Sequence, residues 1–295
     1  MVGARRLKNT LLFLKEIRVE HTLFALPFAY TGAIFAARGI PSWHALLWIT
    51  LAVLGARTAA MAANRYFDRD IDGRNPRTQR RALANKTLAP GVMVAAIAAG
   101  ILLLIVSAWE LNPLCVKLLP IAALGVLAYP LCKRFTWLTH FVLGAVDGLA
   151  PLGAYIAIAG TVSFPAVLLF VAVTLWVAGF DIYYALMDFA VDREQGIRSL
   201  PAAFGEPLGR AIPTTLHLLM FMCLLLAGAA AHTGRGALAY EAGLLAAWAL
   251  IAGELLIVRR SQNVFVLNER IFRANMAFSV VFLVTTAWSF SLSRG

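Results

Sequence analysis

The chain has 295 residues, of which 61% are hydrophobic and only 14% charged, with a formal net charge of +11. Soluble proteins carry roughly a quarter charged residues, so this chain has too few charges to cover a water-exposed surface. The same composition excludes an intrinsically disordered chain, a collagen and a small disulfide scaffold. Its apolar residues fall in long blocks, comparable to the ~20 residues that a helix needs to cross a bilayer. We therefore expect an all-α polytopic membrane protein.

The apolar segments must form helices, because a strand exposed to lipid would leave backbone N–H and C=O groups without hydrogen bonds. Counted loop by loop, 21 Lys and Arg residues lie on one side of the membrane and four on the other. The side richer in Lys and Arg is normally cytoplasmic. We expect a cytoplasmic N-terminus, a C-terminus outside and a location in a bacterial-type inner membrane. The membrane explains the basic charge, so no nucleic-acid partner is expected. We predict nine spans, at residues 22–37, 43–63, 92–108, 113–131, 141–159, 164–185, 211–231, 237–257 and 275–291.

The two longest connections, residues 64–91 and 186–210, lie on the predicted cytoplasmic side. The connections on the other side are much shorter. Long loops in compact proteins usually carry function. We therefore expect the chemistry at the cytoplasmic face of a single integral-membrane domain that covers residues 1–295.

Polar side chains recur at helical spacing where the second and sixth predicted spans reach that face. Residues at i, i+4 and i+8 of a helix lie on one face. The first group has this spacing: Asn64, Asp68 and Asp72. The second group follows i, i+3, i+7 and i+11, again one stripe: Asp181, Tyr184, Asp188 and Asp192. Both spans cross the membrane in the same direction, so we expect both groups at the same depth.

Carboxylates that meet at a membrane boundary repel one another unless a cation lies between them. Hard oxygen ligands suit Mg²⁺, which binds through one or two carboxylates together with a substrate phosphate. Cations for such a phosphate are Arg57 inside the second span, Lys133 after the fourth and Arg77 in the first loop. An intramembrane arginine also needs an anionic partner. The pattern predicts a Mg²⁺-dependent diphosphate site.

The two acidic groups also suggest an internal repeat. Asp68 and Asp188 are 120 residues apart, and so are Asp72 and Asp192. Each group ends the second helix of a set of four. We expect a four-plus-four arrangement with the site where the two halves face each other.

These residues carry a specific resemblance. Asn64, Asp68 and Asp72 match the motif N-x-x-x-D-x-x-x-D, and the stretch from Tyr184 to Asp192 matches Y-x-x-x-D-x-x-x-D. In this pattern the chain resembles the UbiA superfamily of intramembrane prenyltransferases. Within it, the chain is most similar to bacterial 4-hydroxybenzoate polyprenyltransferases, including the variants associated with menaquinone formation by the futalosine route.

The resemblance implies nine helices around a central cavity open to the cytoplasmic face, with Mg²⁺ bridging aspartates to a polyprenyl diphosphate. Arg57 and Lys133 would bind the diphosphate, and Tyr184 would also contact substrate. Asp181 and Tyr129 would lie near a small aromatic acceptor. The residues that would hold Mg²⁺ and diphosphate are Asn64, Asp68, Asp72, Asp188 and Asp192.

The residues and the resemblance predict the same reaction. Asp68 and Asp188 would act with Mg²⁺ to help the diphosphate leave, which produces an allylic cation. An electron-rich phenol ring, such as that of 4-hydroxybenzoate, would attack this cation ortho to its hydroxyl. Asp181 or the diphosphate would then remove the ring proton. A dry apolar tunnel between helices would hold the isoprenoid and exclude water.

Three other functions compete with this interpretation. Intramembrane carboxylates and an internal repeat also fit a secondary transporter, although a transporter needs its site near the midplane. CDP-alcohol phosphotransferases also have paired aspartates, but their Asp-Gly pair ahead of Ala-Arg is missing here. Haem-, chlorophyll- and naphthoate-prenylating branches of the same superfamily differ only in the acceptor. The sequence leaves the acceptor, the isoprenoid length and the oligomeric state open.

Overall fold

The computed structural model describes residues 12–17, 22–232, 234–260 and 264–293, and within these ranges the chain forms helices and turns with no strand. The basic residues of the first eleven positions, which contribute to the predicted topology, lie outside the described ranges. The long helices are α2 (Thr22–Ala37), α3 (Trp43–Arg74), α4 (Pro90–Leu111), α5 (Pro113–Cys132), α6 (Thr139–Ala159), α7 (Phe164–Ala185), α10 (Glu206–Ala231), α11 (Gly234–Arg260) and α12 (Val264–Leu292). Three short ones follow α7, namely η2 (Leu186–Asp188), α8 (Phe189–Gln195) and α9 (Leu200–Phe204).

Within the described ranges, eight helices are long and apolar enough to cross a membrane, which confirms the predicted all-α polytopic class. The first predicted span corresponds to α2, whose 16 residues make it shorter than the others. The number of nine membrane spans and the four-plus-four repeat stay predictions.

Local sequence signals explain where the helices start and stop. Ser42 caps α3 by accepting a hydrogen bond from the Ala45 N–H, and Ser163 caps α7 in the same way. Asn112 separates α4 from α5, and its side chain accepts from two N–H groups at the start of α5. Such side chains satisfy N–H groups that the helix itself leaves unpaired. Gly160, with φ +64°, ends α6 in the left-handed conformation that glycine adopts without strain.

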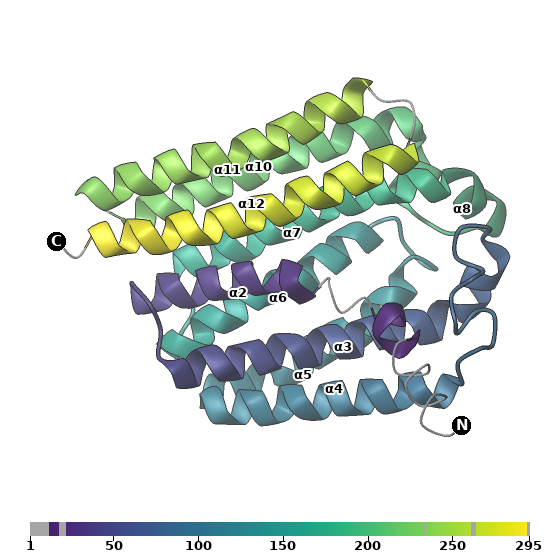
Figure 1. Cartoon of the computed structure of the whole chain (residues 1–295), viewed down its shortest axis with the longest axis horizontal. Coiled ribbons are helices and arrows are strands. Elements are labelled where there is room, and N and C mark those ends of the chain that lie inside the picture. Colours follow the sequence, from purple (N-terminus) through teal and green to yellow (C-terminus); the bar gives the residue numbers. More distant parts are fainter. Residues whose placement is uncertain (1–11, 18–21, 233, 261–263, 294–295) are drawn as a thin grey trace.

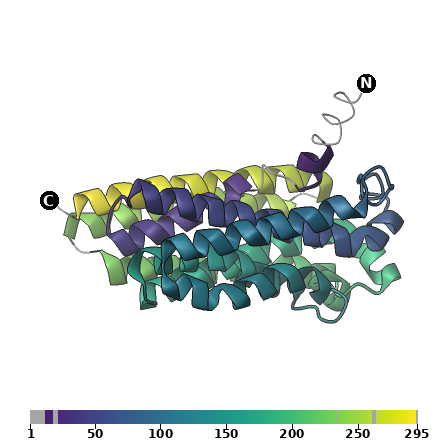
Figure 2. The same cartoon turned by 90° about the horizontal axis from the view of Figure 1, so that it is seen from below.

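All the long helices run along the length of the molecule (Figures 1 and 2). Helix α7 packs on α6 and α10, α3 packs on α4, and α2 packs on α6. The largest core cluster combines aliphatic and aromatic side chains, and in it Phe28, Trp176 and Phe278 contact one another. This packing joins α2, α7 and α12 into one body.

Glycine permits the closest helix contacts. A Cβ atom on Gly55 of α3 would lie 2.6 Å from the Gly100 carbonyl oxygen of α4. A Cβ on Gly144 of α6 would lie 2.2 Å from the Thr174 carbonyl oxygen of α7. Small residues at such crossings let backbones approach, which is how membrane helices gain packing energy.

Two differences from the predicted spans matter for the site. Helix α3 does not stop near residue 63 but continues through Arg74, so the first acidic group lies on regular helix. Helix α7 stops at Ala185 and is followed by a turn of 3₁₀ helix up to Asp188. The tighter 3₁₀ turn has about three residues per turn, so the predicted single α-helical stripe from Asp181 to Asp192 is broken.

Candidate active site

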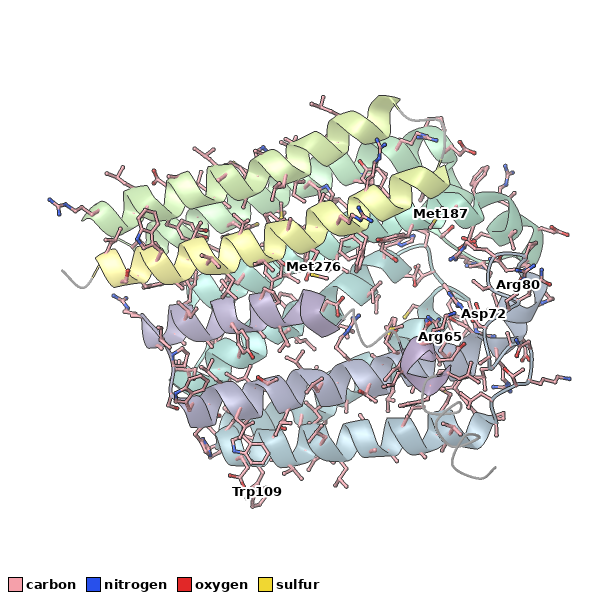
Figure 3. The ribbon with its side chains drawn as sticks, viewed as in Figure 1. Arg65, Asp72, Arg80, Trp109, Met187 and Met276 are labelled. Carbon is pink, nitrogen blue, oxygen red and sulfur yellow. The ribbon has the colours of Figure 1, made fainter. Side chains whose placement is uncertain are left out.

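Both acidic groups lie at one end of the bundle, which we call the carboxylate end. It contains the last turns of α3, the loop of residues 75–89, the residues after α5, and α8. Figure 3 shows Arg65, Asp72, Arg80 and Met187 at this end, whereas Trp109 lies at the opposite end. The fold therefore brings together two acidic groups that are far apart in the sequence.

Asp68 is the most deeply buried of the predicted site carboxylates, with 1% of its surface exposed. Its Oδ2 accepts hydrogen bonds from Lys133 Nζ at 2.5 Å and from Asn64 Nδ2 at 3.0 Å. Its Oδ1 has no hydrogen-bond partner, and Arg134 Nη2 lies 4.0 Å away. A buried carboxylate needs a cation close by, and Lys133 supplies it across 65 residues of sequence.

Asp72, one turn further along α3, is also buried. Arg81 Nη1 donates to both of its carboxylate oxygens at 2.7 Å. Thr78 donates to the Asp72 backbone carbonyl, which folds the loop back over the end of α3. The loop is thus held against the helix that carries the first acidic group.

The same loop reaches the second acidic group. Arg77 Nε donates to Asp188 Oδ1 at 2.8 Å, Arg77 Nη2 donates to Asp188 Oδ2, and Asn75 Nδ2 donates to Asp188 Oδ1 at 2.9 Å. Burial by itself would lower the pKa of Arg77, but the hydrogen bonds and charge of Asp188 outweigh it and raise that pKa. Arg77 therefore stays charged, and its two-point contact with Asp188 joins the α3 side of the site to the α7 side.

The remaining aspartates of the second group have different partners. Asp192 is buried on α8 and hydrogen-bonded to Ser199. Asp181 Oδ2 lies 2.6 Å from His140 Nδ1, and His140 Nε2 accepts a hydrogen bond from the Leu200 N–H at 3.1 Å. A ring nitrogen that accepts from an N–H carries no proton, so the proton of neutral His140 is on Nδ1 and is donated to Asp181.

Arg57 has the anionic partner that an intramembrane arginine requires. Its Nη1 donates to Asp147 Oδ1 of α6 at 3.0 Å. Asn64 is seven residues further along α3, so Arg57 lies about 10 Å deeper in the bundle. Tyr129 is buried on α5 and donates to the Ala60 carbonyl at 3.3 Å, and the ring of Tyr184 meets that of Phe180 edge-on. Arg57 and Tyr129 thus both have hydrogen-bond partners inside the bundle.

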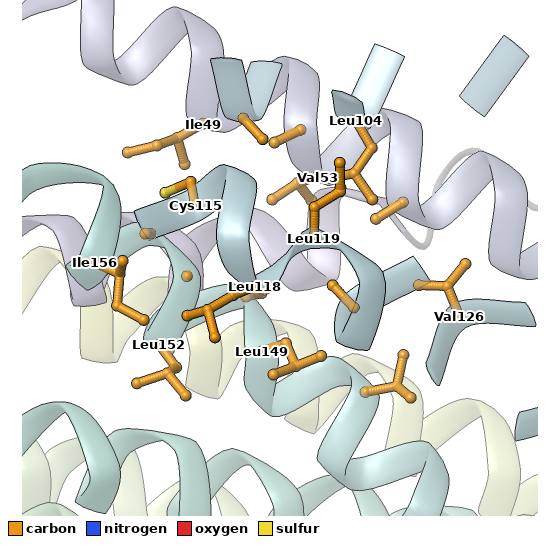
Figure 4. A pocket seen from close by; sticks show the side chains of 18 of the residues that line it. Ile49, Val53, Leu104, Cys115, Leu118, Leu119, Val126, Leu149, Leu152 and Ile156 are labelled. Carbon is orange, nitrogen blue, oxygen red and sulfur yellow. The ribbon is translucent and has the colours of Figure 1, made fainter. Parts of the chain in front are cut away.

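An apolar cavity of about 350 Å³ lies between the helices and is lined by residues of α2 to α6. Figure 4 shows the aliphatic side chains that line it. Arg57 and Asp147 are the two charged residues in its wall. Its lining includes Ile49, Leu104, Cys115, Leu118, Leu149 and Ile156.

A model of the UbiA prenyltransferase family matches residues 25–291. The chain belongs to this family. The 4-hydroxybenzoate octaprenyltransferase of Pseudomonas entomophila is 35% identical over 227 residues, which are 76% of this chain and 75% of that protein. The 4-hydroxybenzoate octaprenyltransferase of Alkalilimnicola ehrlichii is 35% identical over 238 residues, 79% of this chain and 78% of that protein.

Solved structures agree with the family. The apo structure of a UbiA homolog from Aeropyrum pernix K1 superposes with a TM-score of 0.81 at 30% identity, covering 90% of this chain and 97% of that one. A UbiA homolog from Archaeoglobus fulgidus bound to DMAPP and Mg²⁺ shares the fold at a TM-score of 0.70 and 16% identity, covering 93% and 99%. Family membership makes this chain a membrane prenyltransferase and displaces the transporter and phosphotransferase alternatives.

The UbiA fold implies a metal, and the donor types at the carboxylate end fit Mg²⁺. Asp68 and Asp188 present carboxylate oxygens, and the buried Asp68 Oδ1 has no hydrogen bond. Within the described ranges, however, no three His, Cys, Asp or Glu side chains come close enough to hold a metal. Lys133, Arg77 and Arg81 neutralise three of the aspartates instead. The two acidic groups of this UbiA protein thus fit a metal completed by a substrate diphosphate.

Sequence reasoning missed several site residues of this prenyltransferase. His140 is one of only five histidines and immediately precedes the predicted span 141–159, on the same side as both acidic groups, which is a usable signal. Arg81 carried no signal beyond its place in a long polar loop. Asp147 lines the cavity, and α6 continues through Pro151.

Proposed function

We propose that this protein transfers a polyprenyl group from polyprenyl diphosphate to an aromatic acceptor, 4-hydroxybenzoate or a related aromatic acid, in quinone biosynthesis. The observation that carries the proposal is the junction of a carboxylate- and cation-lined end with an apolar cavity. A diphosphate head and a long apolar tail need these two environments side by side. The relatives named 4-hydroxybenzoate octaprenyltransferase support this acceptor.

The diphosphate would bind at the carboxylate end, which faces the cytoplasm of a bacterial-type inner membrane in this proposal. Lys133, Arg77 and Arg81, which pair there with aspartates, would donate hydrogen bonds to its oxygens. Asn64, Asp68, Asp72, Asp188 and Asp192 would hold Mg²⁺ against the diphosphate. When bound, Mg²⁺ would supply charge neutralisation for the leaving diphosphate.

The allylic C–O bond then breaks, and its electron pair leaves with the diphosphate. Lys133 and Arg77 stabilise the charge that develops on the leaving oxygens. The apolar cavity between α2 and α6 holds the isoprenoid chain, and its aliphatic walls keep water from the cation. Arg57 adds a positive charge at the boundary between the cavity and the polar end.

The acceptor ring forms the new C–C bond at the carbon ortho to its hydroxyl, and the ring proton is removed last. Asp181 is the base in this proposal, because the His140 N–H holds its carboxylate in one orientation. Tyr129 and Tyr184 would contact the acceptor and the prenyl diphosphate. A carboxylate that keeps one oxygen free can take the proton.

The test is prenyl transfer by purified protein in detergent, with radiolabelled polyprenyl diphosphate, Mg²⁺ and a panel of acceptors that includes 4-hydroxybenzoate. The expected result is Mg²⁺-dependent product with 4-hydroxybenzoate that disappears in Asp68→Ala and Asp188→Ala. Asp70→Ala is the matched control, because Asp70 is on α3 between the site aspartates but its side chain is 78% exposed. Product formed only with a haem, chlorophyll or naphthoate precursor would overturn the proposed acceptor.

A further inference from the structure

Arg65 is a buried arginine that the proposed chemistry does not use. It follows Asn64 on α3, yet only 5% of its surface is exposed. A buried guanidinium is costly unless its N–H groups are hydrogen-bonded and its charge is balanced. Its Nε donates to the Glu16 carbonyl oxygen at 3.1 Å and lies 3.7 Å from Glu16 Oε2. Its Nη1 donates to Asn64 Oδ1 at 2.8 Å.

Glu16 is equally buried and comes from the segment of residues 12–17, which precedes the membrane helices. Its Oε1 accepts a hydrogen bond from the Ala82 N–H at 2.5 Å. Its Oε2 has no hydrogen bond, so the charge of Arg65 is what balances it. Leu12 and Phe13 pack on the apolar cluster around Ala82, so the segment is docked by packing as well as by charge.

The Arg65 contact decides which way the Asn64 side chain faces. An amide has a carbonyl oxygen on one side and an NH₂ group on the other. Because Arg65 donates to Oδ1, the NH₂ group of Asn64 must face Asp68, where it donates to Oδ2. Without Arg65 the amide could turn and place its oxygen against a carboxylate. The donated hydrogen bond, together with Lys133, fixes Oδ2 and leaves Asp68 Oδ1 free of hydrogen bonds.

We infer that Glu16 and Arg65 are positioning residues that act on Asp68 through the amide of Asn64, and so couple the segment of residues 12–17 to the diphosphate site. This inference rests on the proposed function, because it assumes that Asp68 acts on a metal–diphosphate ligand. It gives Asn64, one of the residues proposed to hold Mg²⁺, the further task of orienting Asp68 by hydrogen bonding. The chain of contacts runs from Glu16 through Arg65 and Asn64 to Asp68 without a gap.

The test measures binding rather than turnover. Thermal unfolding of the full chain in detergent is followed with inorganic diphosphate at increasing Mg²⁺, which gives the Mg²⁺ concentration for half-maximal stabilisation. Changing groups that support metal ligands typically weakens metal affinity about 10- to 100-fold. We expect Glu16→Gln and Arg65→Met to raise the half-saturating Mg²⁺ concentration by about 10-fold or more. Glu194→Gln and Arg69→Met, more exposed residues at the same end, should leave it unchanged.

A double-variant comparison separates positioning from general destabilisation. If Arg65 acts through Asn64, then Glu16→Gln added to Asn64→Ala should cause no further rise in the half-saturating Mg²⁺ concentration. The inference would be overturned if the effects of the two substitutions on the half-saturating Mg²⁺ concentration add up, or if the single variants keep the parent concentration. If Arg65→Met does not fold, Glu16→Gln alone decides, because Gln can still accept from the Ala82 N–H. If Asp68→Ala also keeps the parent value, the proposed function fails, which is a separate outcome.

Discussion

Asp68 of α3 and Lys133 after α5 meet at 2.5 Å between Asp68 Oδ2 and Lys133 Nζ, and Asp68 is almost fully buried. The pair joins the first acidic group to the cation closest to it. It also places a cation directly beside a carboxylate that is buried inside the bundle. A substrate diphosphate can share Lys133 with Asp68, which makes the pair both a structural and a functional element.

Replacing Lys133 by Met should therefore damage stability and activity together. The substitution leaves Asp68 buried beside a neutral side chain, and removing one partner of a buried pair costs about 3 kcal/mol or more. Unfolding by detergent titration should show this loss, and prenyl transfer should fall by about 100-fold, as when one electrostatic donor is removed. Lys133→Arg retains the charge and should therefore keep part of the stability and part of the activity that Lys133→Met loses. Full activity of Lys133→Met would contradict the assigned role.

Arg77 and Arg80 form a matched pair within one loop. Both side chains are exposed, but Arg77 makes the two-point contact with Asp188, whereas no contact of Arg80 with a carboxylate is seen in the described part of the chain. Arg77→Ala should weaken the link between the loop and the second acidic group and lower kcat/KM for the prenyl diphosphate by about 10- to 100-fold, in line with the loss of a charge-assisted donor. Arg80→Ala should retain the parent value. Steady-state kinetics with both variants tests the difference, and equal effects would refute it.

His140 should act through Asp181 rather than on substrate. His140→Leu removes the N–H that orients Asp181, so we expect kcat to fall by about 100-fold with little change in KM, as for loss of a general base. Asn can place an N–H near the position of Nδ1, so His140→Asn should keep more activity than His140→Leu. Equal loss in both variants would mean that the histidine serves packing alone.

The apolar cavity should set which isoprenoid lengths are accepted. Cys115 lines the cavity near the start of α5, whereas the carboxylate end lies beyond the other end of this helix. Cys115→Phe fills space there, so transfer from a long polyprenyl diphosphate should fall about 10-fold relative to geranyl diphosphate, because overfilled apolar sites cost about 1–3 kcal/mol. Leu124→Phe on the same helix is the control, because Leu124 is exposed and does not line the cavity. A uniform loss for both substrates would argue against a tail site.

The sequence predicted the class of fold because that class depends on local pattern, and the same kind of pattern predicted that the first acidic group lies on one helix. Hydropathy locates the helices, and i, i+4 spacing places Asn64 beside Asp68, as the structure confirms. The charge of Arg57 inside a span predicted an anionic partner, but only the fold identifies this partner as Asp147.

Other features depend on contacts between distant segments. The turn at Leu186–Asp188 interrupts a stripe that spacing alone draws as continuous. Glu16 contacts Arg65 across 49 residues, and His140 contacts Asp181 across 41. Sequence periodicity cannot predict such pairs, because they arise from how α3, α6, α7 and the loops pack.

The most direct test of the central claim, that both acidic groups act on one diphosphate, is binding of polyprenyl diphosphate with Mg²⁺ to Asp68→Asn, Asp188→Asn and the double variant. If both carboxylates serve one ligand, either single change should remove most of the Mg²⁺-dependent affinity, and the double variant should lose little more. A shared site would be contradicted if the losses of affinity in the two single variants add up in the double variant, or if either single variant still binds the diphosphate with Mg²⁺-dependent affinity.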